Sequence, residues 1–151
     1  MEWTFSISVP GIQYPVSMAY MLKKAMLFVD DEKMILQSLK TQIKKHFGSQ
    51  YLYEFAESGD EALEVIEELC EEGIELLLVV SDWLMPNMRG DEFLIHVHQK
   101  YPRVVKVMLT GQASDDAVNR AYEHANLHRC LRKPWEEHEL IATLTSGLEA
   151  L

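Results

Sequence analysis

The feature that most constrains this sequence is a short, almost unbroken apolar run over residues 74–80, which gives way abruptly to Ser81 and Asp82. A run of this length with β-branched residues is typical of a strand buried on both faces of a sheet. Pro86 has no backbone N–H to donate and Gly90 tolerates turn geometry, so we expect a loop after the strand. Asp82 is therefore predicted at the carboxyl end of a central strand, where ligands bind in open α/β sheets.

The length and composition of the chain favour one folded domain. At 151 residues the chain can bury about two-thirds of its surface. A hydrophobic content of 48% with 25% charged residues is ordinary for a globular protein. No apolar run approaches the roughly 20 residues that span a bilayer, and the N-terminus lacks the basic start of a signal peptide. We therefore expect no membrane as a partner.

The charge balance and the cysteines restrict the partners and the compartment. The formal net charge of −10 opposes contact with DNA or with anionic lipid. No segment resembles a helix-turn-helix or a basic arm, so DNA is not expected as a partner. The two cysteines, Cys70 and Cys130, come without a secretory context, which suggests reduced thiols in the cytoplasm.

Residues 1–24 differ from the rest of the chain and are interpreted as an N-terminal extension, with the main domain over residues 25–151. The extension carries a net charge of +1, so the remainder carries −11. Apolar and polar side chains alternate over residues 3–9, which is typical of an edge strand. The other interpretation is a loosely attached leader from an upstream start codon, since later methionines can also initiate. Both interpretations stay open.

The main domain alternates between short apolar runs and helical patterns. The predicted strands are residues 25–29, 51–56, 74–80, 104–109 and 129–132. The predicted helices are residues 33–47, 58–73, 92–101, 115–124 and 136–150. Ser58, with Glu61 three residues later, forms a capping box that opens the second helix. Strands that alternate with helices indicate an α/β fold with a parallel sheet and helices on both faces.

Polar residues follow four of these strands. Asp30 and Asp31 end the first strand, Asp82 the third, Thr110 the fourth and Lys133 the fifth. Right-handed crossovers place these strand ends at one edge of the sheet, so the side chains can converge. Three carboxylates in a crevice repel, and without a cation at least one is expected to take up a proton. Mg²⁺, which prefers carboxylate, water and phosphate oxygens, removes that conflict.

The remaining two groups fit the chemistry of phosphoryl transfer. Lys133 supplies a positive charge and Thr110 a hydroxyl donor, and both are suited to stabilising a transferring phosphoryl group. Asp82 is the natural nucleophile, because a carboxylate can carry a phosphoryl group as an aspartyl-phosphate. Alone, Asp82 reads more simply as a solvated residue in a turn. The four groups in this order, each at a strand end, make a specific signal.

Residues 25–150 resemble the receiver domain of two-component response regulators. The resemblance rests on the acidic pair Asp30-Asp31, on Asp82 within Asp-Trp-Leu-Met-Pro, on Thr110-Gly111 and on Lys133-Pro134-Trp135, and it covers about five-sixths of the chain. It implies a flavodoxin-like, doubly wound sheet of five parallel strands in the order 2-1-3-4-5. It also implies a signalling protein that catalyses only its own phosphorylation and dephosphorylation.

The resemblance further implies a role for each site residue. Asp82 accepts a phosphoryl group from a histidine kinase or a histidine phosphotransfer protein. Thr110 and Lys133 contact the phosphoryl oxygens, and the peptide bond before Pro134 is often cis in this family. The residues that match the Mg²⁺ site of the family are Asp30, Asp31, Asp82 and Leu84 through its backbone carbonyl.

One position departs from the family pattern. Receiver domains usually carry Tyr or Phe three residues before the lysine, as a switch that turns inward, and here that residue is Cys130. Turning a small thiol changes little buried apolar area, at ~25 cal/mol per Å². We therefore expect the signal to pass mainly through the Thr110 loop and the helix over residues 115–124 rather than through this side chain.

Several functions stay open at this point. The first is a stand-alone phospho-acceptor that acts on an unknown downstream protein or in a phosphorelay. The second is a regulatory module of a longer protein with an enzymatic output, such as a cyclic-dinucleotide phosphodiesterase or an ATPase. A phosphatase is disfavoured because Leu84 stands where such enzymes carry an acidic general acid, two residues after the nucleophile. A phosphorylation-independent scaffold is disfavoured by the complete set of acceptor, hydroxyl and lysine.

Overall fold

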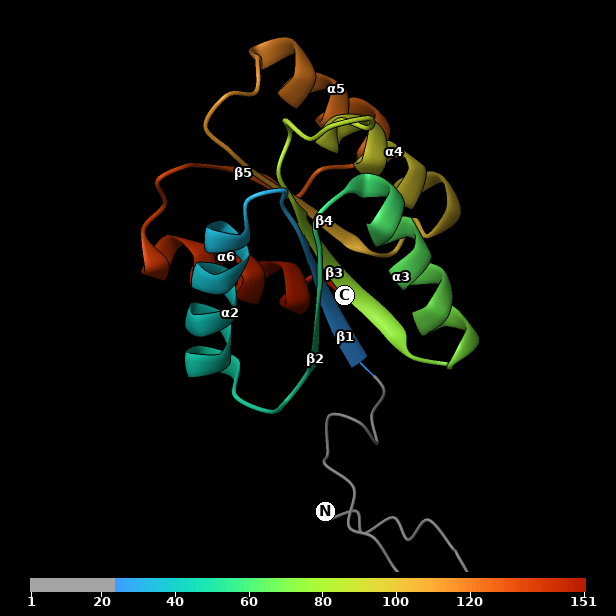
Figure 1. Ribbon diagram of the computed structural model, residues 1–151, viewed down its shortest axis with the longest axis vertical. Helices are drawn as coiled ribbons and strands as arrows, with labels where there is room; N and C mark the ends of the chain where they lie inside the picture. The colour runs from blue at the N-terminus through green and yellow to red at the C-terminus, as the bar shows by residue number, and fades with distance from the viewer. Residues whose placement is uncertain (1–23) are drawn as a thin grey trace, which may run out of the picture.

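Five parallel strands form one sheet in the computed structural model, which describes residues 24–151 (Figure 1). The strands are β1 (Lys24–Val29), β2 (Leu52–Ala56), β3 (Glu75–Ser81), β4 (Val105–Thr110) and β5 (Arg129–Arg132). They lie in the order β2-β1-β3-β4-β5, so the predicted fold class and strand order are confirmed. The alternating pattern over residues 3–9 lies outside the described residues, and the division between an extension and a main domain stays a prediction.

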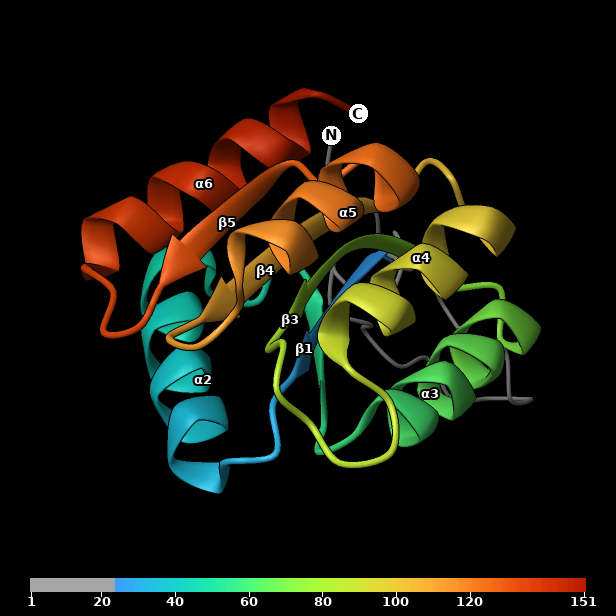
Figure 2. The same ribbon diagram turned by 90° about the horizontal axis from the view of Figure 1, so that it is seen from above.

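Helices cover both faces of the sheet. The helices are α2 (Lys33–Phe47), α3 (Gly59–Glu71), α4 (Gly90–Lys100), α5 (Asp115–Ala125) and α6 (Glu137–Glu149). Figure 2 shows α2 and α6 on one face of the sheet and α3, α4 and α5 on the other. Within the described residues, none of these helices combines the length and the apolar character that crossing a membrane requires.

The two helical layers create two separate apolar cores. Consecutive residues of a strand point to opposite faces, so Leu78 and Val80 pack toward α2 and α6 while Val79 packs toward α3, α4 and α5. All three side chains are at most 1% exposed. This two-sided burial explains why β3 reads as an unbroken apolar run rather than an alternating one. It also leaves the ends of the strands as the place for polar side chains.

Local signals set the ends of several helices. Gly48 ends α2 with a positive φ of 60°, a conformation that glycine adopts without strain. Ser58 caps α3 by accepting a hydrogen bond from the backbone N–H of Glu61 at 3.1 Å, as the capping box predicted. The carboxylate of Glu61 accepts from the N–H of Glu57 rather than from that of Ser58. Helix α4 begins at Gly90, two residues earlier than predicted, which brings Asp91 into its first turn.

One lysine lies inside the core between β4 and α4. Lys106 is 1% exposed, and its ammonium donates a hydrogen bond to the carbonyl oxygen of Pro102 at 3.2 Å and lies 2.8 Å from Nδ1 of His98. Neither neighbour carries a negative charge. Burial therefore lowers the pKa of Lys106 to about 8. Burial, and then the charge of Lys106, lower the pKa of His98 as well.

This buried lysine predicts an unusual dependence of stability on pH. Below about pH 8 Lys106 is protonated in both states, and its buried charge costs on the order of 2–3 kcal/mol. Between about pH 8 and 10.5 the unfolded chain binds a proton that the folded protein has released, so the free energy of unfolding rises through this range. We expect Lys106→Met to remove this rise, measured by urea unfolding at several pH values.

Lys100→Met is the matched control, because the side chain of Lys100 is 64% exposed and its ammonium makes surface contacts, an ion pair with Glu67 and an approach to the Tyr101 ring at 5.7 Å. It is expected to keep the rise of the wild-type protein. If the free energy of unfolding rose equally with pH in Lys106→Met and in the wild-type protein, the assignment of this rise to the buried Lys106 would be contradicted.

Candidate functional site

The predicted site residues meet at the carboxyl edge of the sheet. A cavity of about 660 Å³ opens there between the ends of β1, β3, β4 and β5. Its lining includes Asp31, Asp82, Leu84, Thr110 and Lys133. Five of the six predicted site residues therefore line one cavity, and the sixth, Asp30, contacts Lys133 directly.

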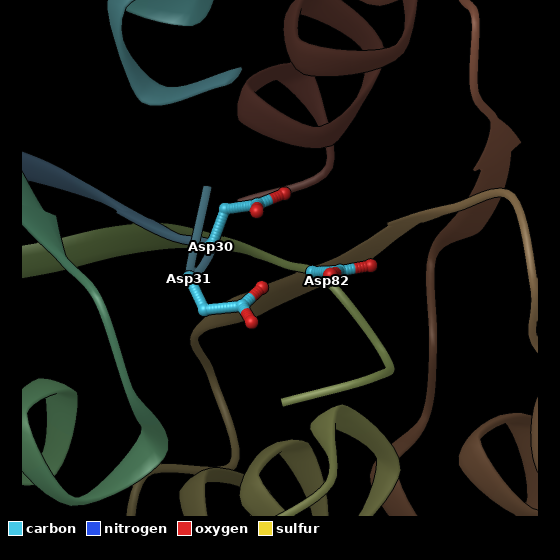
Figure 3. Close-up of side chains that lie close together, drawn as sticks. All are labelled: Asp30, Asp31 and Asp82. Atoms are coloured by element: carbon cyan, nitrogen blue, oxygen red, sulfur yellow. The ribbon is translucent and has the colours of Figure 1, made fainter. Parts of the chain in front are cut away.

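Three carboxylates lie close together in this region (Figure 3). One oxygen of each of Asp30, Asp31 and Asp82 lies within 4.8 Å of the others. Asp30 is 1% and Asp82 6% exposed, whereas Asp31 is open to solvent. Hard oxygen ligands that converge in this way suit a small divalent cation such as Mg²⁺. The arrangement fits the predicted metal site.

Lys133 places a cation between two of these carboxylates. Its ammonium donates a hydrogen bond to Oδ2 of Asp30 at 2.6 Å and lies 3.4 Å from Oδ1 of Asp82. Burial acts to lower the pKa of Lys133, but the hydrogen bond that it donates to Asp30 and the charge of Asp82 outweigh burial and raise the pKa. The peptide bond between Lys133 and Pro134 is cis, as the resemblance implied.

Burial and charge act in opposite directions on Asp82. Burial is the main cause of a raised pKa, and the charge of Asp30 adds to it, while Lys133 and the backbone N–H of Trp83 work against it. The direction agrees with the proton uptake expected from crowded carboxylates. The main cause differs, because burial contributes more to the raised pKa than the charge of Asp30 does.

Thr110 and Leu84 complete the lining of the cavity. Thr110 ends β4, is 1% exposed, and its hydroxyl oxygen accepts a hydrogen bond from the backbone N–H of Gln112 at 3.2 Å. Its carbonyl accepts from the N–H of Lys133 at 3.1 Å, which ties the ends of β4 and β5 together. Leu84 is 45% exposed at the cavity.

Backbone groups that the sequence did not reveal hold Asp82 in place. Its N–H donates to the carbonyl of Val29 at 2.9 Å, and the N–H of Trp83 donates to Oδ1 of Asp82 at 2.8 Å. The carbonyl of Trp83 accepts from the N–H of Gly90 at 2.7 Å. Every residue but proline carries an N–H, so residue type gives no signal for these contacts.

Sequence reasoning also missed Asp91. The residue is buried, and its side chain accepts a hydrogen bond from the indole N–H of Trp83 at 3.0 Å. An acidic residue in the first turn of a helix normally reads as a solvated charge that favours the helix dipole. No periodic spacing links Asp91 to Trp83 across the intervening loop, so only the fold reveals the contact.

Cys130 lies on β5, half-buried against the core that α3, α4 and α5 cover. Burial raises the pKa of its thiol, and the charge of Arg132 opposes this only in part. A reactive thiol needs a lowered pKa. The environment of Cys130 is therefore that of a packed strand residue, and Cys130 and Cys70 are both free.

Comparison with known proteins identifies a family to which the chain is similar. A family model described as the response regulator receiver domain matches residues 26–145. The hydrogenase transcriptional regulatory protein HoxA of Cupriavidus necator is 27% identical over 124 residues, which cover 82% of this chain and 24% of that protein. The sensor kinase CckA of Brucella abortus is 35% identical over 99 residues, which cover 66% of this chain and 10% of that protein. The chain thus spans a quarter or less of these curated relatives.

Solved structures agree with the family model. The signal receiver domain of an HD domain-containing protein from Pseudomonas fluorescens Pf-5 has a TM-score of 0.75 and 28% identity, covering 91% of this chain and 92% of that chain. A CheY-like response regulator receiver domain protein from Methanospirillum hungatei JF-1 has a TM-score of 0.73 and 29% identity, covering 84% and 94% of the two chains.

The close approach of Gly90 to Asp82 gives a test of the site architecture. A Cβ at position 90 would overlap the carbonyl oxygen of Asp82 and lie 2.8 Å from Cα of Trp83, so backbone would have to move. We expect Gly90→Ala to lower the free energy of unfolding by about 1–3 kcal/mol, as overpacking does. Urea unfolding measures this change.

Gly111→Ala serves as the control at the same edge of the sheet. A Cβ there would lie 3.6 Å from the carbonyl oxygen of Lys133, which is ordinary van der Waals contact. Its stability is expected to stay within about 1 kcal/mol of wild type. If Gly90→Ala and Gly111→Ala lowered the free energy of unfolding equally, the close approach of Gly90 to the Asp82 backbone would be contradicted.

Proposed function

The chain belongs to the response regulator receiver domain family, and on that basis we propose that Asp82 accepts a phosphoryl group from a histidine kinase or a histidine phosphotransfer protein. The observation that carries the proposal is the contact of the Lys133 ammonium with both Asp30 and Asp82 beside an open cavity. It supplies a buried nucleophile, a second carboxylate and a cation at one strand edge. Phosphoryl transfer depends mostly on such positioning and charge neutralisation.

Receiver domains bind Mg²⁺ at an acidic pocket, and the three clustered carboxylates here fit that ion. We assign its ligands to Asp30, Asp31, Asp82 and the backbone carbonyl of Leu84. When bound, the ion supplies positive charge to the carboxylates and to the incoming phosphoryl oxygens. Asp31 is the most exposed of the three carboxylates. It can therefore bind an arriving ion without a rearrangement of the core.

The chain's own residues divide the remaining work. A carboxylate oxygen of Asp82 forms the new bond to phosphorus as the donor's bond to phosphorus breaks. The Lys133 ammonium pairs with a phosphoryl oxygen, and the Thr110 hydroxyl donates to another. The N–H of Trp83 holds Oδ1 of Asp82 and so fixes the carboxylate. Receiver domains are signalling modules, and in this proposal the chain catalyses only its own phosphorylation and dephosphorylation.

The output belongs to the same proposal. The phosphorylated domain acts on a downstream protein rather than on DNA or a membrane, because a net charge of −10 opposes contact with anionic polymers and lipids. Two free thiols support a reducing compartment such as the cytoplasm.

A second candidate is a regulatory module of a longer protein with an enzymatic output, such as a cyclic-dinucleotide phosphodiesterase. It is favoured because the matched region makes up 24% of HoxA and 10% of CckA, and because a similar receiver structure comes from an HD domain-containing protein. Reading the coding sequence beyond Leu151 separates this candidate from a stand-alone acceptor.

Phosphorylation of Asp82 is tested directly with acetyl phosphate and Mg²⁺. Mass spectrometry is expected to show one added phosphate on Asp82, because among the carboxylates of residues 24–151 it alone combines burial, the lysine contact and the open cavity. Asp82→Asn and treatment with a chelator are both expected to abolish it. A phosphate on another residue would remove the assignment.

The roles of Asp31 and Lys133 separate in a second test. Asp31→Ala is expected to weaken Mg²⁺ binding at least about tenfold, the lower end of losses seen when metal-supporting residues are replaced. Lys133→Ala is expected to keep Mg²⁺ binding but to respond poorly to phosphorylation, because the phosphoryl charge loses its amine partner. Calorimetric Mg²⁺ titration and amide exchange after acetyl phosphate treatment measure the two effects. Equal loss of metal affinity in both variants would contradict this division.

A further inference from the structure

A connected group of side chains leads away from the acceptor and is not needed for the chemistry. The indole N–H of Trp83 donates to Oδ1 of Asp91 at 3.0 Å, and Oδ2 of Asp91 lies 3.6 Å from Nη1 of Arg120. The guanidinium of Arg89 lies 5.3 Å from the centre of a Trp83 ring. We call Trp83, Asp91 and Arg120 the Trp83 relay. It joins the residue after the acceptor to the first turn of α4 and to the middle of α5.

Asp91 is the central member of the relay. Its side chain is 6% exposed, whereas that of Arg120 is 56% exposed. A carboxylate removed from water needs its hydrogen-bond and charge partners, and loss of one partner leaves a charge uncompensated. The position of the Trp83 indole and that of the Arg120 guanidinium are therefore linked through one buried group. Helices α4 and α5 lie side by side in both views, so this link spans adjacent elements (Figures 1 and 2).

The relay begins at a bond that phosphorylation must change. The backbone N–H of Trp83 donates to Oδ1 of Asp82 at 2.8 Å, a charge-assisted bond while Asp82 is a carboxylate. When Asp82 becomes an acyl phosphate, the negative charge lies on the phosphoryl oxygens instead of the carboxylate, and this bond weakens. The N–H of Trp83 lies in the rigid peptide plane that it shares with the carbonyl of Asp82. The carbonyl of Trp83 lies in the next plane and is held by the N–H of Gly90 at 2.7 Å, so a shift of the first plane turns the Trp83 Cα against a fixed neighbour. A shift of that plane changes the direction of the indole and hence its bond to Asp91.

We propose that the Trp83 relay transmits phosphorylation of Asp82 to α5 in this protein. The inference rests on the proposed function, because it needs Asp82 to be the acceptor. Cys130, the residue at the usual switch position, is small and half-buried and makes no comparable polar link between elements in residues 24–151. The relay instead joins three segments through one hydrogen bond and one ion pair, which is the kind of element that can hold two arrangements.

The test uses the full 151-residue chain, treated with acetyl phosphate and Mg²⁺. Mass spectrometry gives the phosphorylated fraction of each variant, and amide hydrogen exchange across residues 115–125 gives the response, normalised to that fraction. We expect Arg120→Gln to be phosphorylated and to lose the α5 response by about fivefold or more, the lower range of allosteric coupling. Trp83→Phe keeps an aromatic ring but loses the indole N–H, and the same loss of response is expected.

Two matched variants separate the relay from general damage. Trp135→Phe removes an indole that donates to Oε1 of Gln42 at 2.8 Å on the α2 and α6 side, and it is expected to keep the full α5 response. Cys130→Ser is expected to keep it too. The double variant Trp83→Phe with Arg120→Gln is expected to lose no more than either single change, because members of one chain are not additive.

The outcomes distinguish the relay from the function on which it rests. Phosphorylated Arg120→Gln and Trp83→Phe with an undiminished α5 response would overturn the relay and leave the acceptor role of Asp82 intact. Additive losses in the double variant, loss of the response in Trp135→Phe, or no α5 response in phosphorylated wild type would overturn it as well. Absence of phosphate on Asp82 in the wild type would overturn the proposed function and the relay together.

Discussion

The contact of the Lys133 ammonium with Asp30 and Asp82 is the interaction on which the site depends. It joins the carboxyl ends of β1, β3 and β5 through charge, at 2.6 and 3.4 Å. The three ends are brought together because the strands are parallel and β3 lies at the centre of the sheet. Both faces of β3 are packed with apolar side chains, so the polar groups near its carboxyl end gather at this edge. The same parallel sheet thus forms the apolar cores on its two faces and the polar site at the carboxyl ends of its strands.

Two buried lysines show how strongly the surroundings decide the chemistry of one residue type. Lys133 faces carboxylates, which raise its pKa despite burial. Lys106 faces a carbonyl and an imidazole, and burial lowers its pKa to about 8. The first lysine stays a permanent cation, as a partner for phosphoryl oxygens must. The second charges at a cost in stability, and its amine ties the end of α4 to β4 through His98.

The receiver family and the particular side chains of this chain contribute different parts of the description. The family match over residues 26–145 accounts for the sheet, and the roles of the acidic pair, Asp82, Thr110 and Lys133 are the ones that we propose. At the usual switch position the chain carries Cys130, a small residue that is half-buried on β5 and for which we predict no switch role. Trp83, by contrast, follows the proposed acceptor Asp82. Its indole donates a hydrogen bond to Asp91, and Asp91 forms an ion pair with Arg120. A route to α5 through Trp83 is therefore consistent with a missing aromatic switch.

The sequence by itself determined the strands, the helices and the four polar groups at strand ends, because apolar runs, turn residues and helix caps are local signals. The strand order came from the resemblance, and the tertiary structure confirmed it. Only the fold decided that Lys133 contacts Asp30 as well as Asp82, and that the Trp83 N–H holds the acceptor. Only the fold buried Lys106, although a lysine in a strand normally indicates an exposed position. Only the fold also brought Asp91 close to Arg120. Such contacts depend on how closely distant segments pack and on the direction in which backbone groups point. Residue type alone determines neither the packing distance nor the direction.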